Sequence, residues 1–288
     1  MTPPYDEQPP PFLSARIHRL DIAPSLTGLC AGYERGEWRA AQFADHVMKW
    51  LPEFALTASE YEAIRGVNAV DSLRLAAKLV YESDKYQKRG EFGELILHIA
   101  IRQVFQSLPA ISKIYYKTAR NETVKGFDAV HVVGNDDDLE LWLGEVKFYS
   151  DVTSAIREVV SELRDHLSTD YLRSEFMLII NKIDDSWPHA KALRKLLSPD
   201  TSLDQVFRRA CVPILLTYDS SSLASHSLCA DGCPDDLLEE LKRHHADFTS
   251  RSRTLPREVR LHLFLLPLNT KEVLIQVLHE RLRAWQAI

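Results

Sequence analysis

VKGFDAVHVVGNDDDLELWLGEVKFY, residues 124–149, is the stretch that constrains the fold most strongly. Two runs rich in valine and leucine flank the polar segment Gly134–Asp138. Short apolar runs separated by glycine, asparagine and aspartate are typical of two strands joined by a hairpin connection. The sequence therefore predicts antiparallel strands over Lys125–Val133 and Leu139–Phe148.

Charged side chains lie on faces of both predicted strands that are otherwise apolar. Because side chains alternate between the two faces of a strand, Glu145 and Lys147 share a face with the leucines that precede them at every second position. By the same alternation, Asp128 shares a face with two valines. An isolated buried charge is strongly unfavourable, so these groups must be paired or must bind a metal.

Asp128, Glu145 and Lys147 have the order and spacing of the PD-(D/E)XK nuclease motif. Two carboxylates on adjacent strands suit Mg²⁺ or Mn²⁺, which take oxygen ligands and lower the pKa of a bound water. A lysine on the same face can orient that water or neutralise charge on the scissile phosphate. An alternative stays open, in which Asp128 and Lys147 form a structural ion pair and Glu145 lies at a solvated strand end.

An acidic helix is predicted upstream of the hairpin, over Glu91–Ser107. Glu91 and Glu94 are three residues apart and share a face, so one of them could supply a further metal ligand. Glu94, His98 and Arg102 follow one another at four-residue intervals. The alternative is therefore a solvated helix face held by ion pairs.

Helices and strands alternate through the rest of the chain, which predicts an α/β fold with a mixed sheet flanked by helices. Further strands are expected over Leu13–Ile22, 111–118, Phe176–Asn181, Val212–Thr217 and Val259–Leu266. Further helices are expected near residues 37–53, 70–83, 153–168 and 188–197, after Pro234, and over Thr270–Ala287. We divide the chain into a flexible proline-rich arm (1–12), a mostly helical N-terminal region (13–84) and a nuclease-like domain (85–288).

The net charge of −6 is not that of a typical free-standing nucleic-acid binder, which is usually basic. It does not exclude a basic groove on an acidic body. Basic residues flank the predicted site, and any of them could contact phosphates. The DNA-binding candidates are Lys88, Arg89, Lys117, Arg120 and Lys125.

Cysteine usage and hydropathy predict a soluble, cytoplasmic protein. The four cysteines, Cys30, Cys211, Cys229 and Cys233, lack the two paired spacings of a structural zinc site and are expected to be reduced thiols. No apolar run approaches the roughly 18 residues that a membrane span needs. We therefore expect no membrane contact.

Three runs carry a resemblance to a known family: Gly90–Glu94, Val124–His131 and Leu143–Tyr149. Their order and their Gly-Phe-Asp and Gly-Glu-x-Lys-Phe-Tyr blocks are far more specific than Glu-x-Lys alone. They make the chain resemble the HamA family, the nuclease subunits of the bacterial Hachiman antiphage system. The resemblance implies a restriction-endonuclease-like PD-(D/E)XK core with an N-terminal α-rich extension.

The resemblance also implies roles and partners. Asp128, Glu145 and Lys147 would form the nuclease motif, and Glu94 would be the upstream acid. Members of the family are expected to cut DNA when phage infection is sensed, together with a helicase partner, HamB. The sequence contains no Gly-x4-Gly-Lys-Ser/Thr loop, so ATP would bind to another subunit. The competing hypothesis is a catalytically inactive nuclease-fold module for assembly or DNA binding.

Overall fold

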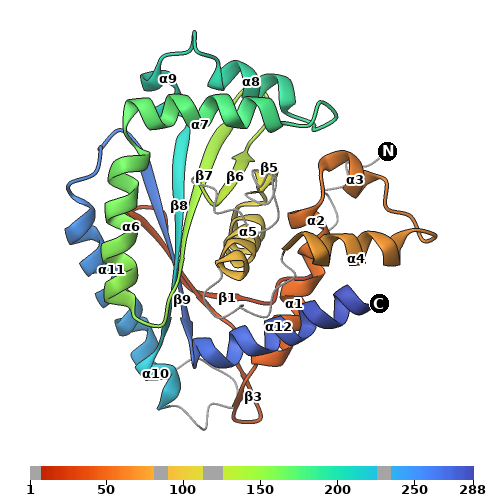
Figure 1. The fold of residues 1–288 in the computed structure, drawn as a ribbon. Coiled ribbons are helices and arrows are strands. Elements are labelled where there is room, and N and C mark those ends of the chain that lie inside the picture. Colours follow the sequence, from red (N-terminus) through yellow and green to blue (C-terminus); the bar gives the residue numbers. More distant parts are fainter. Residues whose placement is uncertain (1–7, 81–89, 113–125, 226–234) are drawn as a thin grey trace.

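One seven-stranded sheet organises the part of the chain that the computed structural model describes, residues 8–80, 90–112, 126–225 and 235–288 (Figure 1). Its strands in chain order are β1 (Ser14–Arg19), β2 (Ser25–Cys30), β5 (Leu108–Ser112), β6 (Ala129–Val133), β7 (Glu140–Phe148), β8 (Ala210–Asp219) and β9 (Arg260–Leu268). A separate two-stranded hairpin consists of β3 (Tyr33–Glu34) and β4 (Glu37–Trp38).

The sheet is mixed, with its strands in the order β1-β2-β9-β8-β7-β6-β5. The four inner strands β2, β9, β8 and β7 run parallel to one another. At one edge β1 pairs antiparallel with β2. At the other edge β6 pairs antiparallel with β7, and β5 pairs antiparallel with β6. The predicted α/β fold with a mixed sheet is confirmed, and the predicted hairpin is the β6–β7 pair.

Helices cover both faces of the sheet and make three layers (Figure 1). One face packs against α1 (Ala40–Lys49), α2 (Leu51–Ala55), α4 (Ala69–Val80), α5 (Glu91–Phe105) and α12 (Lys271–Ala287). The other face packs against α6 (Val152–His166), α7 (Thr169–Lys182), α8 (Ala190–Leu197) and α11 (Asp235–Ser252). Three short helices complete the description: α3 (Ala58–Glu62), α9 (Leu203–Phe207) and α10 (Ser221–Ala224).

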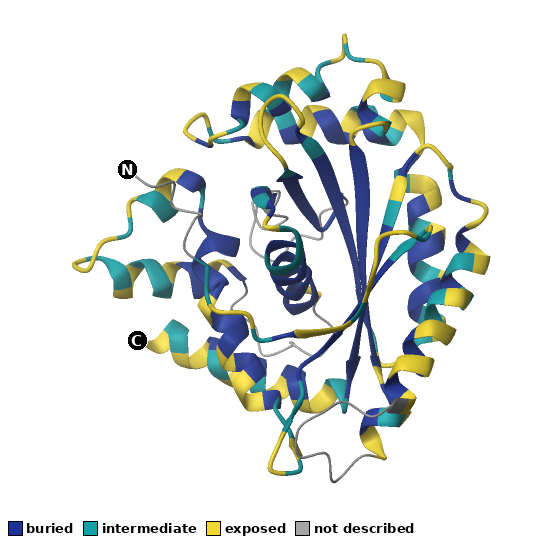
Figure 2. Ribbon diagram, turned by 180° about the vertical axis from the view of Figure 1, so that it is seen from behind, coloured by how far each residue is buried: buried dark blue, intermediate teal, exposed yellow. Residues whose placement is uncertain are grey.

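The helix α5 lies deep in the molecule, and nearly all of its length is buried (Figure 2). Two glycines allow its close approach to the sheet. A Cβ atom on Gly144 of β7 would lie 2.8 Å from Cδ2 of Leu97, and one on Gly93 would lie 2.8 Å from Cβ of Phe148. A glycine inside a strand often marks such a contact. These contacts fix α5 directly on the strand that carries Glu145.

A buried polar network joins α5 to α2. Both carboxylate oxygens of Glu53 accept hydrogen bonds from Arg102, at 2.6 and 3.1 Å, and Nε2 of His98 lies 3.0 Å from Oε1 of Glu53. Burial raises the pKa of Glu53, but the hydrogen bonds and charges of His98 and Arg102 outweigh it and lower the pKa overall. All three side chains are almost fully inaccessible, so the alternative of a solvated helix face is wrong for His98 and Arg102.

One predicted strand, Phe176–Asn181, is wrong because this segment belongs to the helix α7. Its run of apolar residues suggested a strand, yet only every third or fourth side chain is buried: Leu172, Glu175, Phe176 and Ile179. That spacing is the period of a helix with one face on the sheet. Met177 and Leu178, in the middle of the run, are 48% and 45% exposed.

The N-terminal region contributes strands as well as helices. The strand β1 lies within the predicted Leu13–Ile22 segment, whereas β2 was not expected. A Cβ atom on Gly28 of β2 would lie 2.6 Å from Cδ1 of Leu241, so this glycine serves close packing rather than a turn. The predicted boundary between residues 84 and 85 lies outside the described residues, as does most of the predicted arm.

Two further expectations concern cysteine and the membrane. Cys30 is disulfide-bonded, so the expectation of four reduced thiols is wrong at this position, whereas Cys211 is a free, buried thiol. Cys229 and Cys233 lie outside the described residues. Within the described ranges, no helix combines the length and the apolar character needed to cross a bilayer.

Replacing Arg102 by leucine is expected to lower the free energy of unfolding by about 3–5 kcal/mol, because it leaves the buried Glu53 carboxylate without its cation. Chemical denaturation followed by circular dichroism measures the change. Arg251→Leu is the matched control, since Arg251 forms an exposed pair with Asp247 on α11 and should change stability by less than about 1 kcal/mol. Equal losses for both variants would contradict the importance of the network.

Candidate active site

The strands β6 and β7 bring Asp128, Glu145 and Lys147 to one face of the sheet. Ala129 pairs with Gly144 and Val130 with Leu143, so Asp128, which directly precedes β6, lies beside Glu145. Its backbone N–H donates to the carbonyl of Gly144, and its Oδ2 accepts from the backbone N–H of Val146, each at 2.8 Å. These two bonds hold the carboxylate of Asp128 across the strand pair.

Glu145 is bound by a histidine from α6. Nδ1 of His166 lies 2.5 Å from Oε1 of Glu145, and the glutamate side chain is only 2% exposed. Burial lowers the pKa of His166, but the hydrogen bond and charge of Glu145, with the charges of Glu162 and Asp128, outweigh burial and raise it. The imidazole therefore carries a positive charge more readily here than in water.

Lys147 is bound by carboxylates from the same helix. Its Nζ lies 2.5 Å from Oε2 of Glu162 and 3.7 Å from Oε1 of Glu158. Burial, a hydrogen bond with Glu158 and the negative charges of Glu158 and Glu162 raise the pKa of Tyr149 to about 12. The end of β7 therefore lies in an acidic environment that α6 supplies.

The sequence left open a structural ion pair between Asp128 and Lys147. In the described part of the chain, the ion pairs of Lys147 are with Glu162 and Glu158 instead. Glu145 is not at a solvated strand end, because it is buried. All three side chains are thus held on a buried face, each by a different contact.

Glu94 comes from a different element than these three residues. Glu94 lies in the first turn of α5, which packs on the opposite face of the sheet, and it is 8% exposed. Its role as a metal ligand stays a prediction. The DNA-binding candidates Lys88, Arg89, Lys117, Arg120 and Lys125 lie outside the described residues.

Four acidic or basic residues near this site escaped the sequence reasoning. Glu158, Glu162 and His166 follow one another at four-residue intervals within a correctly predicted helix, so their shared face was visible in the sequence. Glu175 directly precedes the incorrect strand Phe176–Asn181, so the helix that carries it was not predicted. Its Oε1 accepts from the backbone N–H of Phe127 at 3.3 Å and helps to hold the segment that leads to Asp128.

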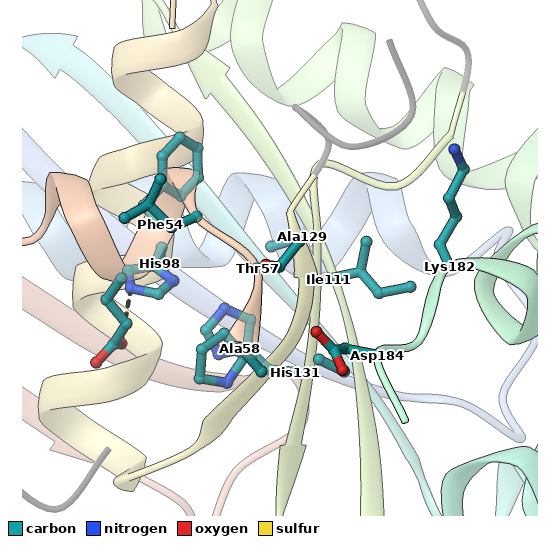
Figure 3. Close-up of a pocket in the computed structure, with 13 residues that line it drawn as sticks. Phe54, Thr57, Ala58, His98, Ile111, Ala129, His131, Lys182 and Asp184 are labelled. Atoms are coloured by element: carbon teal, nitrogen blue, oxygen red, sulfur yellow. Dashed lines mark ion pairs between the residues drawn. The ribbon is translucent and has the colours of Figure 1, made fainter. Parts of the chain in front are cut away.

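Two cavities lie away from these side chains. One, of about 40 Å³, lies at the β5 edge of the sheet between His98, His131, Phe54 and Asp184 (Figure 3). It has room for water but not for a nucleotide. A larger cavity of about 800 Å³ lies where β7 and β9 begin, and Trp142 is among its lining residues. Neither cavity is lined by Asp128, Glu145 or Lys147.

Comparison with known proteins assigns the chain to a family. A family model described as HamA matches residues 10–282. The chain belongs to the HamA family. The resemblance seen in the sequence is therefore confirmed, and membership makes the chain a Hachiman defence-related protein. No curated protein matches the chain.

This HamA family member should show a histidine that titrates above the ordinary value of 6.5, because Glu145 stabilises the imidazolium of His166. The contribution of that pair to stability is then fully present below pH 6.5 and is lost as the pH rises through the raised pKa. Metal-free protein should therefore lose its stability advantage over His166→Phe between neutral and alkaline pH.

NMR titration of the ring protons and chemical denaturation at several pH values measure both effects. His189→Phe is the control for the denaturation series, since His189 pairs with the exposed Asp136. A His166 midpoint at or below 6.5 would show that burial, not Glu145, dominates.

Proposed function

We propose that the chain is a metal-dependent DNA endonuclease, the cytoplasmic effector of a bacterial antiphage system, that hydrolyses phosphodiester bonds under the control of a helicase partner. The observation that supports this most is the buried face shared by Asp128, which directly precedes β6, and by Glu145 and Lys147 of β7. Their order and spacing are those of the PD-(D/E)XK motif, and they occur in a member of the HamA family.

The carboxylates of Asp128 and Glu145 fit a hard divalent cation. Within the described ranges, no group of three or more histidine, cysteine, aspartate or glutamate side chains is arranged to hold a metal ion. Mg²⁺ does not require such a cage, because it commonly binds through one or two carboxylates and keeps several waters. When bound there, Mg²⁺ or Mn²⁺ would polarise the scissile phosphate and acidify a bound water. We propose Glu94 as a further acidic contributor, directly or through water.

The chain's own residues would orient and neutralise the reacting groups. Asp128 is fixed by the backbone N–H of Val146, so its carboxylate does not need to reorganise during the reaction. The ammonium of Lys147 can neutralise charge that develops on the phosphate or orient the attacking water. Burial of all three side chains strengthens these electrostatic effects, since charges interact more strongly away from water.

Family membership and one absent sequence motif support the proposed partners. A Gly-Lys step occurs nowhere in the 288 residues, so the chain has no phosphate loop of that type. A HamB-like helicase would then supply ATP binding and would deliver DNA to a chain whose net charge is −6. We propose that Lys88, Arg89, Lys117, Arg120 and Lys125 contact the DNA backbone.

A second candidate function is a catalytically inactive nuclease-fold module for assembly or DNA binding. The observation that favours it is that α6 already binds both Glu145 and Lys147. Isothermal calorimetry with Mn²⁺ separates the two functions. An inactive module should bind Mn²⁺ no better than its Glu145→Gln variant, whereas a nuclease should bind it measurably and lose that binding in the variant.

Cleavage of DNA in the presence of Mg²⁺ is expected for the full chain, alone or with its helicase partner, and should stop with a chelator. Asp128→Asn, Glu145→Gln and Lys147→Met should each lower the rate by about 100-fold or more, because each removes a group that acts on the transition state. Lys242→Met is the matched control, since Lys242 forms an exposed pair with Glu239 on α11. Unchanged cleavage in all three site variants, at normal folding, would refute the site.

A further inference from the structure

We infer that α6 is a part of the active site, in which His166 positions Glu145 and Glu162 positions Lys147. This inference rests on the proposed nuclease function and adds two residues to its site. Neither residue belongs to the PD-(D/E)XK motif. Both act through another side chain, so they are positioning residues rather than catalytic ones.

The spacing of the two elements makes the double contact possible. Glu145 and Lys147 are two residues apart on a strand, which separates them by about 6.6 Å along β7. Glu162 and His166 are four residues apart on a helix, which separates them by about 6 Å along α6. About one turn of helix therefore matches two residues of strand, and both contacts form at 2.5 Å.

The direction of the chain sets which residue meets which. Only residues 149–151 separate β7 from α6, and α6 returns alongside the sheet (Figure 1). The later residue of the strand, Lys147, therefore meets the earlier residue of the helix, Glu162. The earlier residue, Glu145, meets the later one, His166. A buried stripe on α6 holds the helix against the sheet: Ala155, Ile156, Val159, Val160 and Leu163.

Two aromatic rings fix the imidazole of His166. The ring of Tyr171 from α7 stacks on it with 4.4 Å between ring centroids and 16° between planes, and the ring of Phe127 meets it edge-on at 5.4 Å. A side chain that is packed on two sides keeps one rotamer. Nδ1 of His166 is thereby held at Oε1 of Glu145, as an outer-shell partner holds a ligand.

Glu162 holds the ammonium of Lys147 in the same way. Its oxygen is 2.5 Å from Nζ, whereas that of Glu158 is 3.7 Å away, so Glu162 is the main partner. Lysine has a long, flexible side chain, and its position is otherwise set by four torsions. The ion pair with Glu162 restricts these torsions. It also compensates the charge of an ammonium whose side chain is only 11% exposed.

The two contacts predict different defects. His166→Leu removes the partner of a proposed metal ligand, so Mn²⁺ affinity, measured by calorimetry, should fall about 10- to 100-fold, and cleavage should fall with it. Glu162→Ala removes the partner of a residue that is not a ligand. Its kcat should fall by a similar factor, while Mn²⁺ affinity stays within about threefold of the parent. Asp165→Leu, at an exposed position of α6, is the control that should change neither value.

A second pair of variants keeps the test valid if His166→Leu does not fold. Asparagine places an N–H donor near the position of the histidine Nδ1, whereas glutamine places it near that of Nε2. His166→Asn should therefore recover most of the Mn²⁺ affinity, and His166→Gln should not. Equal affinities for these two folded variants would overturn the inference for His166.

The outcomes separate this inference from the proposed function. If the parent chain binds Mn²⁺ and cleaves DNA, Asp128→Asn does neither, and the α6 variants match the parent, the nuclease stands and the role of α6 is refuted. Faster cleavage by Glu162→Ala or His166→Leu would also overturn it, because the contacts would then restrain the site. Absence of Mn²⁺ binding by the parent chain, with no cleavage either alone or with the helicase partner, would refute both.

Discussion

The placement of ionised side chains on the buried face of β7 is the constraint on which the rest of the structure depends. Glu145 and Lys147 follow leucines on a strand that is covered on both faces, where charge without a partner is strongly unfavourable. The neighbouring elements supply compensation at each position. His166 and Glu162 come from α6, and the backbone of β7 itself binds the carboxylate of Asp128.

Neutralising the charges of buried residues such as Glu145 and Lys147 favours stability but can reduce their catalytic use. A charge that is fully neutralised by its neighbours is stable but less available to a substrate or a metal. Here each contact leaves the motif on one face with its geometry fixed by rigid elements, which is the arrangement that favours a preorganised site. The same contacts support the inactive module as the alternative, so the strength of metal binding decides between the two functions.

Much of this could be predicted from the sequence because it depends on local periodicity. Alternation within residues 124–149 was enough to predict the β6–β7 hairpin and the shared face of Asp128, Glu145 and Lys147. The helix α7 was missed because a short apolar run fits either a strand or a helix. The burial of Arg102 could not be predicted either, since its partner Glu53 lies 49 residues earlier on a different helix. The partners of Lys147 and Glu145 likewise depend on how α6 returns along the sheet.

The parallel pairing of β2 with β9 limits how such a protein can change during evolution. Loss of the residues before α5 would uncover the edge of β9, and an uncovered edge recruits strands from other chains. It would also remove Glu53 and leave the buried guanidinium of Arg102 without this carboxylate partner. We therefore expect deletions from the N-terminal side to promote aggregation and substitutions on its exposed surface to have smaller effects. Sequence differences among relatives should be frequent on the exposed surface of the N-terminal region and rare in β2.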